Sequence, residues 1–166
     1  MLNQIYDTCE FIKEKINFIP EYGVILGSGL GDFAEDIKIE FTLPYEEIPN
    51  FPVSTVSGHK GALLFGTVGT KKVIAMQGRF HYYEGYDMKQ VTFPIRVMKH
   101  LGITKLIVSN ASGGVNSNYK VGSIVIINNH INMMPEHPLR GANDERLGPR
   151  FVNMSEPYSH HMIAKA

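Results

Sequence analysis

Three short apolar runs in this 166-residue sequence end in loops that are rich in glycine and small polar residues. These loops are "LGSGLG" (Leu26 to Gly31), "QGRFHYYEGY" (Gln77 to Tyr86) and "SNASGG" (Ser109 to Gly114). Short apolar runs bounded by glycine are typical of buried strands. Ligands of open α/β sheets gather at such strand ends, so the sequence predicts an α/β fold with a ligand site there.

Two helices are predicted from the spacing of apolar residues and from their end signals. Residues 2–16 place apolar side chains at helical spacing along one stripe, which predicts an amphipathic helix. A second helix is expected from about Met88 to Leu101 and should be bent near Pro94. Asp87 precedes it at capping-box spacing, and Gly102 is the residue type that commonly ends a helix.

The strands are predicted from runs of apolar and β-branched residues. "ALLFGTVGTKKVIAMQG" reads as a hairpin whose two-residue loop, Gly69-Thr70, suits a type II′ turn. "GSIVIINNHIN" (Gly122 to Asn132) predicts another buried strand, and the proline-rich stretch after it predicts a long loop. "SHHMIAKA" is expected to begin a helix. The order of these elements favours a mixed sheet with helices packed on it.

Composition excludes several classes of protein. Hydrophobic residues make up 43% of the chain and charged residues 19%, which is typical of a globular domain. Sixteen basic residues balance sixteen acidic ones, so no global field favours nucleic acid or an anionic membrane. Cys9 is the only cysteine and lies on the predicted apolar stripe, so we expect a buried side chain that forms no internal disulfide. No signal peptide or membrane span is evident, and a cytoplasmic location is expected.

The stretch "QGRFHYYEGY" carries the most specific chemistry. Arg79 offers a fixed fork of donors that suits phosphate or carboxylate. In an extended segment His81 and Tyr83 would point to the same side as Arg79, and Glu84 could fix the orientation of His81. The alternative interpretation is an aromatic corner that packs under the sheet, with Arg79 at the surface. Phe80 and Tyr82, on the other face of the stretch, would suit such packing.

The remaining polar loops give weaker signals. Ser28 lies in the first glycine-rich loop, where backbone amides and a hydroxyl could meet an anion, although a plain glycine turn is the slightly favoured interpretation of this motif alone. His59 lies between glycines in "SGHKG", where a solvated histidine is the simpler interpretation. The small residues around Asn110 and Ala111 would let a ligand approach the backbone closely. Together these loops suggest a phosphate-sized anion beside a polar, partly aromatic pocket.

The combination of motifs resembles one enzyme family. "GSGLG", "SGHKG", "GRFHYYEGY", "NASGG", "NNHIN" and "HPLRGANDERLGPRF" occur in this order in purine nucleoside phosphorylases of the trimeric class. The resemblance implies a three-layer α-β-α fold with a central mixed sheet, of the phosphorylase/hydrolase type, formed by one domain over residues 1–166. It also implies phosphorolysis of purine nucleosides to the free base and ribose 1-phosphate, without a metal or organic cofactor.

The resemblance also assigns roles to individual residues. Tyr83 and Asn110 would contact the nucleoside, Glu84 would support the phosphate-site histidine, and Phe151 would reach into the sugar pocket of a neighbouring subunit in a homotrimer. The phosphate site would be made by Ser28, His59, Arg79, His81 and the backbone at Ala111.

Family members continue well beyond residue 166, so the chain is expected to be an N-terminal portion whose base-selecting residues are absent. If 166 residues were the whole protein, an inactive phosphate-binding module would be the expected product. A methylthioadenosine phosphorylase is the rival enzyme, although its sequences match "GRFHYYEGY" and "NASGG" less well. A dinucleotide-binding dehydrogenase is supported only by the glycine turn.

Overall fold

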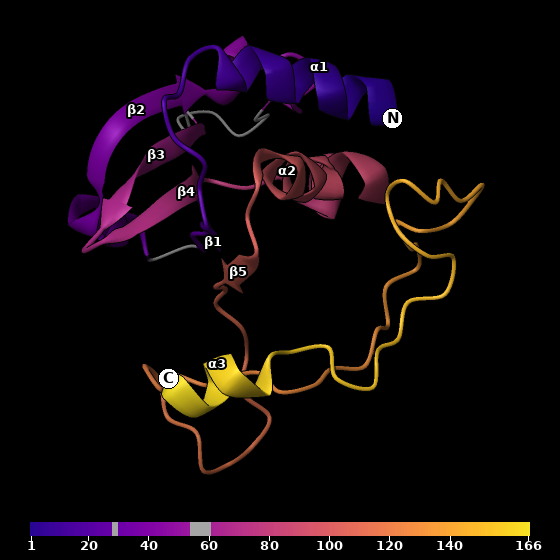
Figure 1. Ribbon diagram of the computed structural model, residues 1–166. Helices are drawn as coiled ribbons and strands as arrows, with labels where there is room; N and C mark the ends of the chain where they lie inside the picture. Colours follow the sequence, from indigo (N-terminus) through magenta and orange to yellow (C-terminus); the bar gives the residue numbers. More distant parts are fainter. Residues whose placement is uncertain (28–29, 54–60) are drawn as a thin grey trace. The chain divides into compact units, whose positions relative to one another are not determined.

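The computed structural model describes residues 1–27, 30–53 and 61–166, and contacts divide the chain into two compact units (Figure 1). The first unit runs from Met1 to Ala111 and the second from Ser112 to Ala166.

The first unit is built on a mixed sheet. Among the described residues the sheet has five strands in the order β2-β3-β4-β1-β5. The pairs β2–β3 and β3–β4 are antiparallel, whereas β1 pairs in parallel with both β4 and β5. The strand bounds are β1 Tyr22–Ile25, β2 Lys38–Pro44, β3 Ala62–Val68, β4 Lys71–Gln77 and β5 Lys105–Val108. The predicted α/β fold with a mixed sheet is therefore confirmed.

The predicted hairpin is formed by β3 and β4. Val68 pairs with Lys71, which leaves Gly69 and Thr70 as the two-residue loop. Gly69 has φ of 57°, and Asn50 is the only non-glycine residue of the described part with a positive φ. A positive φ at the first loop position alone is the requirement of a type II′ turn, as the sequence predicted.

Helix α1 (Leu2–Lys13) and helix α2 (Met88–Leu101) pack against each other beside the sheet (Figure 1). The predicted capping box is present at the start of α2. The Asp87 carboxylate accepts from the Gln90 amide at 2.8 Å, and the Gln90 side chain accepts from the Asp87 amide at 2.9 Å. Gly102 ends the helix in the left-handed conformation with φ of 115°. The two caps satisfy backbone groups at the ends of α2 that have no partner within the helix. They also fix where the helix begins after the stretch "QGRFHYYEGY".

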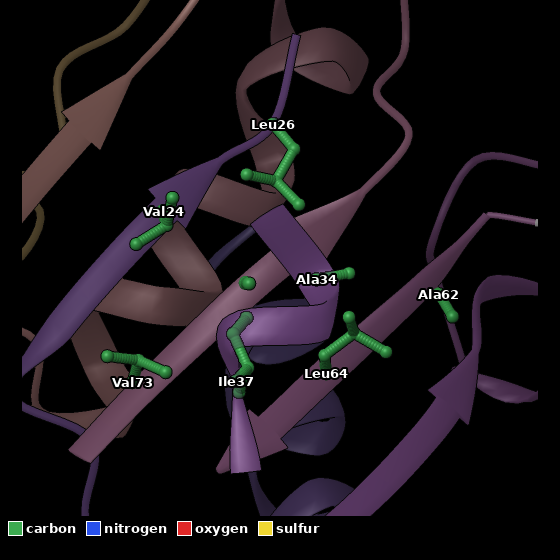
Figure 2. Close-up of a cluster of buried hydrophobic side chains, with 8 residues drawn as sticks. Val24, Leu26, Ala34, Ile37, Ala62, Leu64 and Val73 are labelled. Atoms are coloured by element: carbon green, nitrogen blue, oxygen red, sulfur yellow. The ribbon is translucent and has the colours of Figure 1, made fainter. Parts of the chain in front are cut away.

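Alternation along the strands gives the sheet two apolar faces. On one face the short 3₁₀ helix η1 (Gly31–Asp36) covers the strands, and Figure 2 shows Ala34 and Ile37 beside Leu64 and Val73. The sequence expected a helix after the first glycine-rich loop, and the structure has this single 3₁₀ segment instead. The opposite face carries Phe65 and Ile74, both fully buried.

The second unit has little regular structure. It contains α3 (His160–Lys165), for which Ser159 is the N-cap, so the helix predicted from "SHHMIAKA" is present, and the proline-rich stretch forms turns and loops. The predicted buried strand over residues 122–132 is wrong. This segment forms no strand, and Ile124 and Ile131 are 96% and 88% exposed. A strand needs a neighbour to pair its backbone groups, and within the described ranges no strand is hydrogen-bonded to this one.

No helix within the described ranges combines the length and the apolar character that crossing a membrane requires.

Cys9 should be chemically inert in the folded protein. Its side chain is 3% exposed and its thiol donates to the Val97 carbonyl at 3.6 Å, while burial raises the pKa of the thiol to about 11. At pH 8 this leaves about 100-fold less thiolate than its unshifted pKa would give. We therefore expect iodoacetamide to modify Cys9 only after unfolding in urea, as followed by intact mass. Rapid labelling of the folded chain would contradict the buried position.

The same shift affects stability at alkaline pH. Because the folded pKa lies above the unfolded one, Cys9 contributes stability at pH values below the unfolded pKa, and this contribution is lost as the pH rises toward about 11.

Candidate functional site

Parallel pairing brings three strand ends to one edge of the sheet. Ile25 of β1 is in register with Met76 of β4 and with Val108 of β5. The chain therefore leaves all three strands near the same level, and the loops that begin at Leu26, Gly78 and Ser109 start next to one another. This is the edge at which the sequence predicted a ligand site.

Ser109 links the ends of β1 and β5. Its hydroxyl donates to the Ile25 carbonyl at 3.1 Å and accepts from the Gly27 amide at 2.9 Å. The two loops approach so closely that a Cβ on Gly27 would lie 2.5 Å from the Ser109 carbonyl oxygen. Only glycine fits there without a backbone shift. Sequence analysis did not single out Ser109, although it is the first hydroxyl residue after an apolar strand.

Arg79 joins the end of β4 to this pair. Its Nη1 donates to the Ser109 carbonyl at 2.9 Å, and its Nε donates to Nε2 of His81 at 3.1 Å. The side chain is partly buried rather than directed freely into solvent. A guanidinium held at two points presents its cationic fork in a fixed orientation at the edge of the sheet.

The hydrogen bonds of His81 define which ring nitrogen carries the proton. Arginine has donors only, so the Nε2 that receives its Nε–H must be unprotonated. In the neutral ring the proton is then on Nδ1, which lies 2.7 Å from Oε1 of Glu84. The imidazole is thus oriented by a carboxylate on one side and a guanidinium on the other.

Glu84 supports His81, as the sequence predicted. Its Oε1 also accepts from the His81 backbone amide at 2.9 Å, and its side chain is only 3% exposed. The bond from the His81 amide to the Glu84 carboxylate is the half of a capping box that Glu84 supplies to the 3₁₀ helix η3 (Tyr82–Glu84). A buried carboxylate that accepts from both the ring and the backbone holds the imidazole more firmly than either bond alone.

Tyr83 lies on the same side as Arg79 and His81, but through a different geometry from the predicted one. The stretch is not extended, because η3 turns it, and the turn stacks the Tyr83 ring on His81 at 4.7 Å with a 21° interplanar angle. Tyr83 is 78% exposed, which leaves its ring and hydroxyl accessible. The alternative of an aromatic corner holds for Phe80, which is 4% exposed, but not for Tyr82, which is 36% exposed.

The remaining predicted site residues are Ser28, His59, Asn110, Ala111 and Phe151. Ser28 and His59 lie outside the described residues. Asn110 and Ala111 follow β5 and are exposed, and the Asn110 side-chain amide donates to the Ala111 carbonyl at 3.4 Å. Phe151 is in the second unit and is 89% exposed. No structural observation tests the roles expected of these residues.

The groups that gather at this edge of the sheet suit an oxyanion. In the described ranges, no group of three or more His, Cys, Asp or Glu side chains could hold a metal ion. What gathers instead is a guanidinium, an imidazole that a carboxylate orients, and loop backbone after β5. These are the groups with which proteins bind phosphate and carboxylate.

Comparison with known proteins points to one family. The family model of the phosphorylase superfamily matches residues 21–166. Purine nucleoside phosphorylase 1 of Geobacillus stearothermophilus is 53% identical over 158 residues, which are 95% of this chain and 58% of that protein. Purine nucleoside phosphorylase 1 of Bacillus subtilis (strain 168) is 51% identical over 166 residues, which are 100% of this chain and 61% of that protein. The chain thus spans about 60% of the length of these curated relatives.

Solved structures agree with the sequence relatives. Isoform 2 of purine nucleoside phosphorylase from Schistosoma mansoni, in complex with cytosine and ribose-1-phosphate, superposes with a TM-score of 0.92 at 42% identity over 98% of this chain and 58% of that one. A purine nucleoside phosphorylase in complex with ribose-1-phosphate gives a TM-score of 0.92 at 44% identity over 98% of this chain and 61% of that one.

The tautomer of His81 can be measured directly. Because Arg79 occupies Nε2 and Glu84 accepts from Nδ1, we expect long-range ¹H–¹⁵N spectra of the neutral ring to report a protonated Nδ1 and a bare Nε2. Glu84→Ala removes the acceptor and should shift the population toward the Nε2–H form. The signals of His100 on α2 should not change and serve as the control. A wild-type ring protonated at Nε2 would contradict the hydrogen-bond pattern described here.

Proposed function

This chain belongs to the phosphorylase superfamily, and we propose that the protein containing it is a purine nucleoside phosphorylase. The reaction is the cleavage of a purine nucleoside by inorganic phosphate, which yields the free base and ribose 1-phosphate. The observation that carries the proposal is the juxtaposition of Arg79, His81 and Glu84 with the end of β5. Relatives more than 50% identical are named for this activity, and two related structures were solved with ribose-1-phosphate.

Phosphate would bind at the aligned strand ends. Arg79 would supply two parallel donors to the dianion, and the Ala111 amide would add a backbone donor. His81 would donate through Nε2 once that nitrogen is protonated, while its Nδ1–H stays on Glu84. The Arg79–His81 bond would open at this step, because a protonated Nε2 can no longer accept. We assign Ser28 and His59 to the same phosphate site from the family resemblance.

The reaction follows from this placement of charge. A phosphate oxygen forms a bond to C1′ of the ribose as the bond from C1′ to the purine nitrogen breaks, and the bonding electron pair leaves with the base. Positive charge develops on the sugar in the transition state, and a phosphate dianion held beneath the ring stabilises it. Fixing the phosphate also removes much of the entropic cost of a reaction between two molecules. Tyr83 and Asn110 would contact the nucleoside at the open side of the site.

The remaining expectations belong to the same proposal. The protein would act as a homotrimer in the cytoplasm and would need no cofactor, because phosphate itself is the second substrate. Phe151 would complete the sugar pocket of a neighbouring subunit, which would make the active site dependent on assembly.

The direct test of the proposed function is inosine cleavage by the full-length protein. We expect hypoxanthine to be released only when phosphate is present, with ribose 1-phosphate formed in equal amount. A coupled xanthine oxidase assay follows the base, and ³¹P NMR follows the sugar phosphate. Release of hypoxanthine without phosphate would indicate a hydrolase, and no release from inosine or guanosine would reject the proposal.

Arg79→Ala should weaken phosphate binding specifically. Loss of hydrogen bonds from a charged donor costs roughly 1.5–3 kcal/mol, so the KM for phosphate should rise roughly 10- to 100-fold. The melting temperature should change by no more than a few degrees. Arg96→Ala, which removes the same charge from α2, is the matched control and should leave the phosphate KM unchanged. Unaltered activity of Arg79→Ala at low phosphate would mean that Arg79 does not bind the anion.

A further inference from the structure

Tyr45 is a buried residue at the end of strand β2. It begins the 3₁₀ segment η2 (Tyr45–Glu47), directly after β2, and is 3% exposed. Burial raises the pKa of its phenol, so the hydroxyl keeps its proton and acts as a donor. No feature of the sequence separated it from the other tyrosines.

The first contact of Tyr45 is with the start of β3. Its backbone amide donates to the Gly61 carbonyl at 3.0 Å. Its ring lies against Gly61, where an added Cβ would come within 2.3 Å of two ring carbons. The ring and this strand end therefore fit together only because residue 61 has no side chain.

The second contact is with the end of β4, on both sides of Arg79. The Tyr45 hydroxyl donates to the carbonyl of Gly78 at 2.7 Å. Its ring packs on Phe80 with centroids 5.0 Å apart. Gly78 and Phe80 are the residues immediately before and after Arg79, so one side chain holds both of its neighbours.

We propose that Tyr45 is a positioning residue that fixes the backbone of Arg79 and thereby the phosphate affinity of the site. The inference rests on the proposed function. The ring alone satisfies the packing with Phe80 and Phe51, whose centroid is 5.6 Å away. The hydroxyl adds a bond to the peptide that leads into Arg79. Without that bond the peptide of Gly78 can rotate, and the Arg79 guanidinium is no longer held in position to donate to the Ser109 carbonyl.

Tyr45→Phe in the full-length protein tests the proposal, because it removes one oxygen and keeps the ring. Thr8→Val is the matched control. The Thr8 hydroxyl is fully buried and donates to the Pro49 carbonyl at 2.7 Å, the same kind of bond at the same length. It also accepts from the Asn50 side-chain amide at 3.3 Å, so both of its hydrogen-bond partners lie at residues 49 and 50 and neither is a neighbour of Arg79 in the chain. Melting temperature and the phosphate and inosine kinetics are measured for both variants. If Tyr45→Phe is insoluble, 4-fluorophenylalanine at position 45 replaces it, since it fills the tyrosine volume without a donor.

The expected result is a rise in the phosphate KM of about fivefold or more in Tyr45→Phe, with kcat within about twofold of wild type. Thr8→Val should lower the melting temperature by a similar amount and leave the phosphate KM unchanged. A phosphate KM that stays at the wild-type value in Tyr45→Phe overturns the proposal, as does an equal rise in both variants, which would reflect general destabilisation. A wild-type protein that binds no phosphate and cleaves no inosine would instead overturn the proposed function itself.

Discussion

The parallel pairing of β1 with β4 and β5 is the constraint on which the site depends. In a parallel sheet the strands run in one direction, so their carboxyl ends meet at one edge. Here the register aligns Ile25 with Met76 and with Val108, to the residue. The three loops that follow carry Gly27, Arg79 and Ser109. A shift of one residue in either pairing would turn the neighbouring side chains to the other face and separate these groups.

From this edge a continuous chain of hydrogen bonds runs through the site. It begins at the Gly27 amide and passes through Ser109 to Arg79, then through His81 to Glu84. Each member orients the next: the serine fixes the strand ends, its carbonyl holds the guanidinium, and the buried carboxylate holds the imidazole. Networks of this kind lose more than one bond when a member is removed, because the neighbouring groups lose their orientation as well. The guanidinium and the imidazole are therefore held in fixed orientations.

Local sequence patterns predicted the secondary structure of the first unit better than that of the second. In the first unit, the hairpin loop at Gly69, the capping box at Asp87 and the buried stripe that includes Cys9 formed as the sequence predicted, since short-range geometry decides each of them. In the second unit, the β-branched run around Ile124 predicted a strand that did not form. Its apolar character is a local property, but a strand exists only when another strand satisfies its backbone groups.

The sequence by itself determined the fold class, the family, the polar stretch that forms part of the candidate site and the partnership of His81 with Glu84, a pair three residues apart. These features depend on residue type and close spacing, which a linear pattern records. Only the tertiary structure decided that Ser109 holds Arg79 across 30 residues and that Tyr45 holds Gly78 across 33. It also decided that Tyr83 reaches His81 through a turn rather than an extended strand. Contacts between distant residues depend on the register of the sheet and on which backbone carbonyls and amides still lack a hydrogen-bond partner. The spacing of residue types along the chain predicts neither of these.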